Sequence, residues 1–217
     1  MKQKILSLIF SMIMALGFTT SSNAIGLEGL GIGVSLGNGG FYAVGEEKKD
    51  NKDTGTDDTK EAGAFKNDWG SVFVEYGVGA VKLGIDYHID EIQTPTNTNI
   101  QGSTTNNVAA TFSNHTTAYL LLPIWGGLYV KAGGIYVEIE TNENLGTGGE
   151  YGNTDTTGIT AGFGFDKEVQ DGFSIRFEAL AAQYEDVSAT NSKNPTISVN
   201  VKDMMGAHGK ISVVKTF

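Results

Sequence analysis

The sequence predicts an all-β chain of eight antiparallel strands that close into an up-and-down barrel. Three observations favour this fold. After residue 25, apolar and polar residues alternate with a period of two, which is typical of strands with two unlike faces. The connections between the alternating segments are long and short in turn. Glycine supplies 30 of the 217 residues, which suits a narrow barrel with crowded inward positions.

The first 24 residues are expected to be a signal peptide rather than a part of the barrel. Lys2 and Lys4 precede an apolar run over residues 5–18, and Ser22 and Ala24 form a small-x-small cleavage site. A transmembrane helix needs about 20 apolar residues, so this run is too short to span a membrane comfortably. We therefore expect an exported chain whose barrel domain covers residues 25–217.

The first four predicted strands place apolar side chains on one face and mostly small or polar side chains on the other. They cover residues 30–37, 70–76, 81–90 and 116–122. The third is the clearest, because Leu83 and Ile85 alternate with Lys82 and Asp86. In the strand over residues 30–37, the face opposite the apolar one is mostly glycine. The strand over residues 116–122 is largely apolar on both faces.

The last four predicted strands repeat this arrangement with one interruption. They cover residues 128–140, 158–165, 173–181 and 205–213. In the third of these, Ile175 and Phe177 lie on the face opposite Arg176. The first changes phase near Gly133 and Gly134, which predicts a β-bulge there.

The connections between these strands alternate in length. The long ones, rich in Asp, Thr and Asn, cover residues 45–68, 91–112, 141–154 and 186–203, and the short ones cover 77–79, 123–127 and 166–172. An up-and-down barrel with both chain ends at its short-turn end produces this rhythm, as in bacterial outer-membrane barrels. We therefore expect four long polar loops at one end of the barrel.

The apolar face is expected to meet lipid, and the small and polar face to line the interior. Glycine on the inner face relieves crowding in a barrel of only eight strands. A soluble barrel would bury its apolar face instead, and alternation alone reads the same both ways. An exported soluble barrel that binds a small apolar ligand therefore remains an alternative.

Aromatic residues gather near the predicted strand ends, where interfacial girdles of membrane barrels lie. Those expected at the membrane interface are Tyr76, Trp125, Tyr129, Phe165, Phe173 and Phe217, and Tyr42, Trp69, Tyr87 and Tyr184 also lie near strand ends. Phe217 follows Ile211 and Val213 on one face, which resembles the terminal aromatic signature of outer-membrane barrel proteins. Lys215 departs from that pattern, but at an interface its ammonium group can reach water.

Taken together, the chain resembles the small outer-membrane barrels of the OmpA and OmpX type over residues 25–217. The resemblance rests on architecture and on the final Phe, and on no catalytic motif. It implies a transmembrane barrel in the bacterial outer membrane, with lipid as a partner and recognition of Phe217 by the barrel-assembly machinery. It also implies a structural or surface-interaction role, with limited passage of small solutes and an extracellular partner for the long loops.

Eight titratable residues fall on the face expected to line the lumen: Glu75, Lys82, Asp86, His88, Arg176, Glu178, His208 and Lys210. Buried charges are strongly unfavourable unless they are paired and hydrogen-bonded, so we expect a network of ion pairs. Such a network would be either a structural plug or a rearrangeable gate in a narrow pathway.

Composition excludes several other functions. The chain has no cysteine, so thiol chemistry and disulfides are excluded, and a net charge of −10 argues against nucleic-acid binding. Asp53 and Asp57 lack the spacing of a calcium loop, and we expect no cofactor and no metal. A lipid-modifying barrel enzyme remains an alternative, although His208 is followed by Gly209 and Lys210 where lipid A deacylases carry His-x-Ser. We therefore expect a non-enzyme.

Overall fold

The computed structural model describes residues 29–51, 55–101, 104–146 and 148–217. The expected signal peptide, residues 1–24, and the expected first barrel residue, Ile25, lie outside these ranges. Within the described ranges, no helix is both long and apolar enough to span a membrane.

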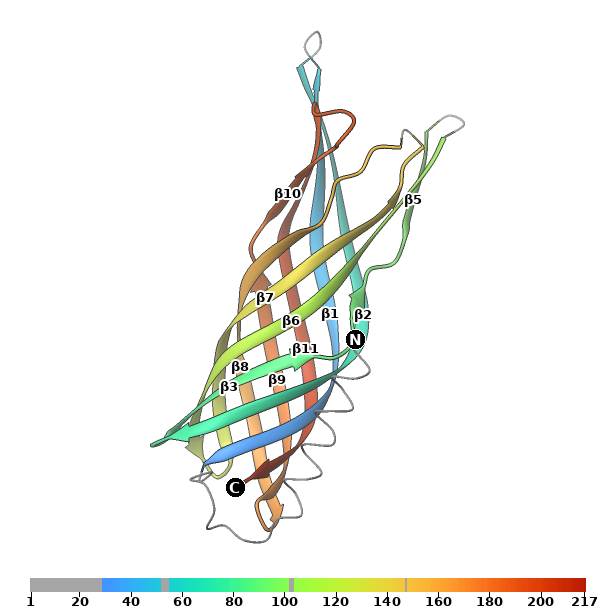
Figure 1. Ribbon diagram of the computed structural model, residues 1–217. Coiled ribbons are helices and arrows are strands. Elements are labelled where there is room, and N and C mark those ends of the chain that lie inside the picture. Colours follow the sequence, from blue (N-terminus) through green and yellow to red (C-terminus); the bar gives the residue numbers. More distant parts are fainter. Residues whose placement is uncertain (1–28, 52–54, 102–103, 147) are drawn as a thin grey trace.

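Eight long antiparallel strands form a closed ring, as predicted (Figure 1). They are β1 (Leu30–Asn51), β2 (Gly55–Val78), β3 (Val81–His88), β6 (Thr104–Trp125), β7 (Leu128–Asn144), β8 (Thr154–Gln170), β9 (Phe173–Tyr184) and β11 (Ile197–Thr216). Each pairs with the next in this order, and β11 returns to pair with β1, from Thr216 opposite Gly31 to Ile197 opposite Lys49.

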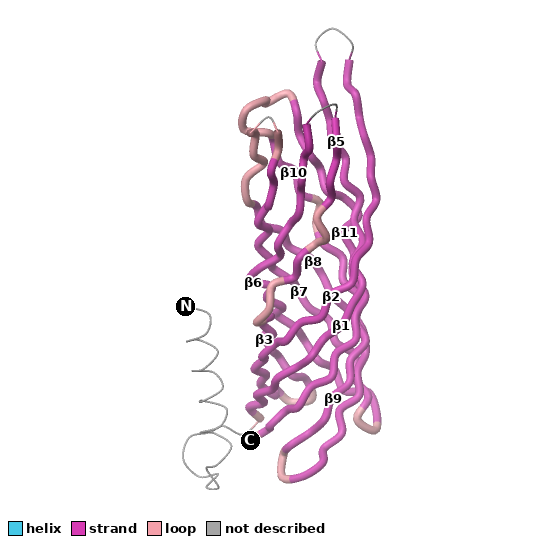
Figure 2. The backbone as a smooth tube through the Cα atoms, turned by 90° about the vertical axis from the view of Figure 1, so that its right-hand side faces the viewer, coloured by secondary structure: helices cyan, strands magenta, loops and turns pink. Residues whose placement is uncertain are grey.

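The short connections are tight turns at one end of the ring, the lower end in Figure 2. Gly126 and Gly127 join β6 to β7, and Asp171 and Gly172 join β8 to β9. All four residues have positive φ, between 46° and 89°. Two-residue hairpins of this kind match the twist of the flanking strands, and glycine adopts their left-handed conformation at least cost.

The long connections are largely strands and not the loops that the sequence predicted. The first is a hairpin, in which β1 and β2 stay in register up to Asn51 opposite Gly55. The second holds β4 (Ile92–Gln93) and β5 (Asn97–Gln101), which pair with β6, and the fourth holds β10 (Val187–Thr190), which pairs with β11. The hairpins extend the barrel wall beyond the apolar band, where both faces meet water and alternation of polarity disappears.

The bulge predicted at Gly133 and Gly134 is wrong. Pairing of β7 with both neighbours runs through these residues without a shift. The register of β6 against β7 shifts elsewhere, between Ser113 and Thr116 and between Pro123 and Trp125. At the first of these shifts, Asn114 has a φ of 52°. The apolar residues of β7 do change face here without a bulge: Leu128 and Val130 are exposed outside, whereas Ile135 and Val137 are buried inside.

The apolar face of the barrel points outward and the polar face inward. Leu36, Ile159 and Phe163 on the outer face are between 64% and 69% exposed, whereas Glu75 and Arg176 on the inner face are 1% exposed. The polarity of a soluble barrel is therefore reversed beside the charged interior. Some inner positions are apolar all the same: Leu121, Ile135, Val137, Ile139 and Leu180.

Two inward glycines make room for large inward aromatic rings. A Cβ atom on Gly84 would lie 2.3 Å from the ring of Tyr119, and one on Gly164 would lie 2.3 Å from the ring of Tyr129. Each glycine is opposite the tyrosine in the register of the neighbouring strand. These two tyrosines reach across the lumen and hold its charged groups.

Candidate functional site

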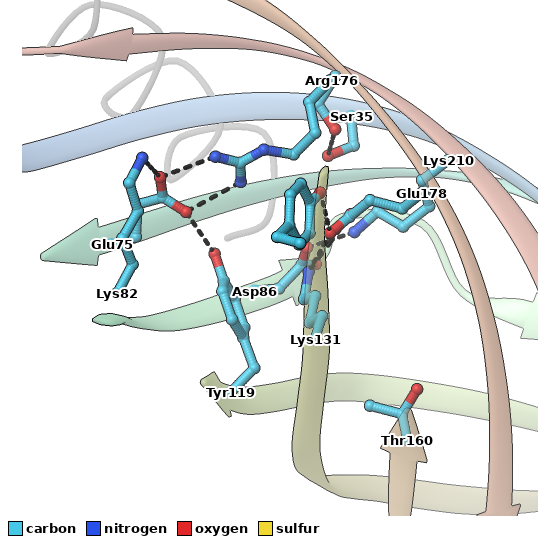
Figure 3. Close-up of polar contacts among 12 residues, drawn as sticks. Ser35, Glu75, Lys82, Asp86, Tyr119, Lys131, Thr160, Arg176, Glu178 and Lys210 are labelled. Carbon is cyan, nitrogen blue, oxygen red and sulfur yellow. Dashed lines mark hydrogen bonds and ion pairs between the residues drawn. The ribbon is translucent and has the colours of Figure 1, made fainter. Parts of the chain in front are cut away.

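The first group of charges in the lumen centres on Arg176 of β9. Its guanidinium donates two hydrogen bonds of 2.9 Å to the two carboxylate oxygens of Glu75 on β2 (Figure 3). It also donates to Asp166 of β8, at 2.8 and 3.2 Å. Lys82 and Tyr119 donate to Glu75 as well, at 2.8 and 3.2 Å. These five residues are called the arginine cluster below, and they connect five separate strands.

The second group lies beside the first and contains two ion pairs. The ammonium group of Lys131 donates to both oxygens of Glu178, at 3.0 and 3.3 Å, and the hydroxyl of Tyr129 donates to the same carboxylate at 2.9 Å. Lys210 donates to Asp86. The Lys131 ammonium also lies 3.9 Å from the centre of the Tyr119 ring, which links this lysine cluster to the arginine cluster.

The two clusters balance in charge. The carboxylates are Glu75, Asp86, Asp166 and Glu178, and the cations are Lys82, Lys131, Arg176 and Lys210. Removal of such groups from water is compensated only when partners and further hydrogen bonds are in place. The paired set fills this part of the lumen with ion-paired groups, and Oδ1 of Asp86 is left without a hydrogen-bond partner.

A third group lies nearer the long-hairpin end of the barrel. His88 stacks on His115 with ring centres 4.0 Å apart, and Trp69 stacks on the other side of His88 at 5.1 Å. His208 meets the edge of Trp69 at 5.3 Å, and the Tyr184 hydroxyl lies 3.1 Å from Nε2 of His115. We call these five residues the histidine chamber, because they line one internal cavity.

All eight residues predicted to line the lumen lie on its inner side. Glu75, Asp86, Arg176, Glu178 and Lys210 are buried in the two charge clusters, and Lys82 joins them with its side chain 28% exposed. His88 and His208 lie in the histidine chamber instead. Figure 3 shows the charged members converging from different strands.

Sequence reasoning missed seven further members of these groups: Trp69, His115, Tyr119, Tyr129, Lys131, Asp166 and Tyr184. Lys131 and Tyr129 were hidden because the glycines at 133 and 134 suggested a change of phase on β7. Asp166 was assigned to a turn, although β8 continues past it to Gln170. His115 follows the irregular residue Asn114, and the alternation of β6 is broken there.

The interface assignment of Tyr129 is wrong, since this residue is 2% exposed and binds Glu178 inside the barrel. Trp69, also near a predicted strand end, is buried inside as well. The structure leaves Tyr76, Trp125, Phe165 and Phe173 exposed on the outer face. Phe217 is half-buried, and the Lys215 ammonium lies 4.6 Å from the Phe173 ring centre and 5.6 Å from that of Phe217.

A separate ion cluster lies in the strand extensions beyond the apolar band. Glu46 of β1 accepts from Lys202 of β11 at 2.7 Å and pairs with Lys60 of β2 at 3.1 Å. The hydrogen bonds from these two lysines lower the pKa of Glu46 to about 2. Glu46 therefore joins three neighbouring strands where no lipid supports them.

The chain was compared with known proteins. The outer membrane protein OprG from Pseudomonas aeruginosa is 12% identical, over 85% of this chain and 97% of OprG, with a TM-score of 0.50. The fold is that of a small outer-membrane β-barrel. No protein-family model and no curated protein sequence matches this chain.

Two further structures are similar at lower TM-scores. Neisserial surface protein A is 10% identical over 84% of this chain and 97% of its own, with a TM-score of 0.38. The outer membrane protease OmpT from Escherichia coli is 8% identical over 91% of this chain and all of its own, with a TM-score of 0.45. These likenesses are too distant to bear on the activity of the present barrel.

Within the described part of the barrel, no group of three His, Asp or Glu side chains is arranged to hold a metal ion. The charged side chains are instead arranged to hold one another. The arrangement pairs the charged side chains across the interior and leaves three imidazoles around one small cavity.

Proposed function

We propose that the chain is a bacterial outer-membrane barrel with a structural or surface-interaction role, carried by its strand extensions. The observation that carries this proposal is the reversed polarity of the wall. Large apolar side chains such as Phe163 and Ile159 are exposed outside, while five ion pairs and their tyrosines lie inside. Lipid is the surrounding that makes such a surface favourable.

The closed lumen supports a structural role over a general transport role. Arg176 and Lys131 each bind a carboxylate from another strand across the interior. Water-filled channels need about 16 strands, and a ring of eight is filled by its own side chains. We therefore propose that solute passage is at most slow and requires these pairs to separate.

The extensions supply surface for a partner. β3 pairs with β2 only between Ser71 and Val78, so the longer part of β2 has one edge without a strand partner in the described residues. Extended peptides and strands of other proteins add to free edges through main-chain hydrogen bonds. This edge favours a protein partner at the outer surface.

Membrane insertion and closure are tested together by refolding the full barrel domain into lipid vesicles and planar bilayers. We expect folding into vesicles and no conductance steps from the unaltered chain. The Arg176→Ala, Glu178→Ala variant, in which both clusters lose a member, is expected to give steps. Steps of equal size and frequency in both proteins would contradict a plug, and failure to associate with vesicles would contradict the membrane role.

The surface role is tested with a shortened hairpin. Removal of residues 47–59 and insertion of Asn-Gly keeps Glu46 opposite Lys60, so the barrel below is unchanged. Cells that display the full chain should adhere to a cultured epithelial layer better than cells with the shortened variant. Cells that display the control variant Asp155→Asn, which is changed on another extension, should adhere as well as cells with the full chain. Equal adhesion of all three would exclude this hairpin as the binding element.

We also propose that the barrel is not an enzyme. The three histidines lie inside the barrel, and His88 and His115 stack on each other instead of on a nucleophile. The buried hydroxyl of Ser113 forms no hydrogen bond to either ring. Unchanged outer-membrane lipid profiles on expression of the chain and of a His88→Ala variant are the expected result.

A further inference from the structure

The histidine chamber contains every histidine of the chain, His88, His115 and His208. They come from β3, β6 and β11, so the fold gathers them from distant parts of the sequence. The cavity between them has a volume of about 20 Å³, which is the space of about one water molecule. Every imidazole of the chain therefore lies in this chamber, and imidazole is the side chain that most often changes charge in mildly acidic solution.

The chamber holds polar atoms that the barrel itself does not satisfy. Nδ1 of His88, Nδ1 of His115 and Nε1 of Trp69 have no hydrogen-bond partner, although all three side chains are buried. The same is true of Oδ1 of Asp86, which lies two residues before His88 on the same face of β3. Three ring nitrogens and one carboxylate oxygen thus remain available around one cavity.

The charges that face the chamber are already paired with one another. Asp86 on β3 binds Lys210 on β11, and Lys131 on β7 binds Glu178 on β9. β2 contributes the indole of Trp69, β6 contributes Thr117, and β9 also contributes the hydroxyl of Tyr184. No carboxylate is left over for an imidazolium, except through the free oxygen of Asp86.

A protonated imidazole in this chamber would therefore compete with the ion pairs of the lumen. Two imidazoles whose centres are 4.0 Å apart repel each other strongly when both are charged and buried. An imidazolium beside Asp86 attracts the carboxylate that holds Lys210, and it repels the ammonium groups of Lys210 and Lys131. Protonation thus acts on the same ion pairs that close the lumen.

We propose that the histidine chamber is a proton-binding site that loosens the ion-paired plug in acid. At neutral pH the three rings are uncharged and stack, and the Lys210–Asp86 and Lys131–Glu178 pairs close the lumen. In acid a proton enters the chamber, Asp86 is shared between an imidazolium and Lys210, and the interior becomes easier to open. This proposal does not depend on a surface partner, because it concerns the lumen alone.

Trp69 is a built-in reporter for the test, because it stacks on His88 and the chain has only one other tryptophan, Trp125. A Trp125→Phe background leaves Trp69 as the sole indole, and a charged imidazole quenches an indole that it contacts. In detergent-refolded protein we expect Trp69 fluorescence to fall as the pH is lowered from about 7.5 to about 4.5. The rate of unfolding in urea should rise about tenfold over the same range. This is the effect of one proton that binds the opening barrel with a pKa about one unit higher than in the closed barrel.

The His88→Gln, His115→Gln, His208→Gln variant in this background should lose both responses, because glutamine keeps hydrogen-bonding capacity without titrating. Glu46→Gln, which removes a carboxyl group outside the chamber, should leave both responses unchanged. If the triple variant does not fold, His88→Gln alone replaces it and should weaken the fluorescence response, because only His208 then still contacts Trp69. An unaltered chain without a pH response, or variants that keep the full response, would overturn the proposal.

Discussion

Arg176 and Glu75 are 101 residues apart in the sequence and form two parallel hydrogen bonds of 2.9 Å across the lumen. The pair joins β9 to β2, two strands that are not neighbours in the ring. It therefore connects opposite parts of the wall through the interior. A cross-link of this kind resists flattening of the barrel in a way that pairing between adjacent strands does not.

Removal of the arginine alone should be strongly destabilising. In Arg176→Met, Glu75 and Asp166 lose their shared cation while Glu75 stays buried, and breaking a buried pair in this way costs about 3–5 kcal/mol. The Arg176→Met, Glu75→Gln variant removes both charges and should recover part of the loss. Urea unfolding of the four proteins in a double-mutant cycle measures the coupling, and additive single effects would show that the pair contributes nothing as a unit.

Gly164 is expected to be intolerant of even a methyl group. In Gly164→Ala the new Cβ would lie 2.3 Å from the Tyr129 ring and 2.8 Å from a backbone oxygen of Phe177, so the free energy of unfolding should fall by about 1–3 kcal/mol. Gly40→Ala is the matched control, since no heavy atom lies within 4 Å of its new Cβ. Equal unfolding midpoints for the two variants would show that Tyr129 moves aside freely.

Acid should loosen the strand extensions through Glu46. The pKa of Glu46 is lowered to about 2 in the folded barrel, below its ordinary value of 4.5. The ionised carboxylate therefore contributes its full stabilisation above about pH 4.5, and this contribution is lost as the pH falls toward 2. Hydrogen exchange at the Val44 and Lys202 amides, corrected for intrinsic rates, should speed up from pH 5 to pH 3.

The Glu46→Gln variant has no carboxylate to protonate at this position. Its corrected exchange rates at Val44 and Lys202 should already be fast at pH 5 and should change little with acid. If the exchange rates of the variant and of the original chain change by the same factor over this range, a group other than Glu46 controls the opening of the extension.

A charge on the outer face should oppose insertion into lipid. Phe163 is 64% exposed within the apolar band, and an arginine at the middle of a bilayer costs about 2–4 kcal/mol on a lipid-facing barrel position. Phe163→Arg should lower the stability in vesicles by about that amount. Asp155→Arg on the same strand lies outside the band and should have little effect. A soluble barrel would show no such difference between the two positions.

Much of the barrel wall was predictable from the sequence, because each strand segment within the apolar band contrasts lipid-facing and inward side chains. Ile175 and Arg176 show this contrast directly, and the eight strands and their order were predicted correctly. The extensions were not, since Lys60 and Thr59 both meet water and leave no alternation to detect. Tyr129 could not be assigned from type alone, because an aromatic residue near a strand end suits an interface or a crowded lumen equally.

The pairing of β1 with β11 also has a consequence for how the chain folds. Gly31 meets Thr216, so the contacts that seal the wall join residues from the two ends of the described chain. Contacts of such long sequence separation form slowly, because a long segment must be ordered before they stabilise anything. Until β11 arrives, β1 has a free edge, and any intermediate is an open sheet at risk of pairing with another chain. We expect assembly to be slow and nearly all-or-none, and to depend on protection of that edge.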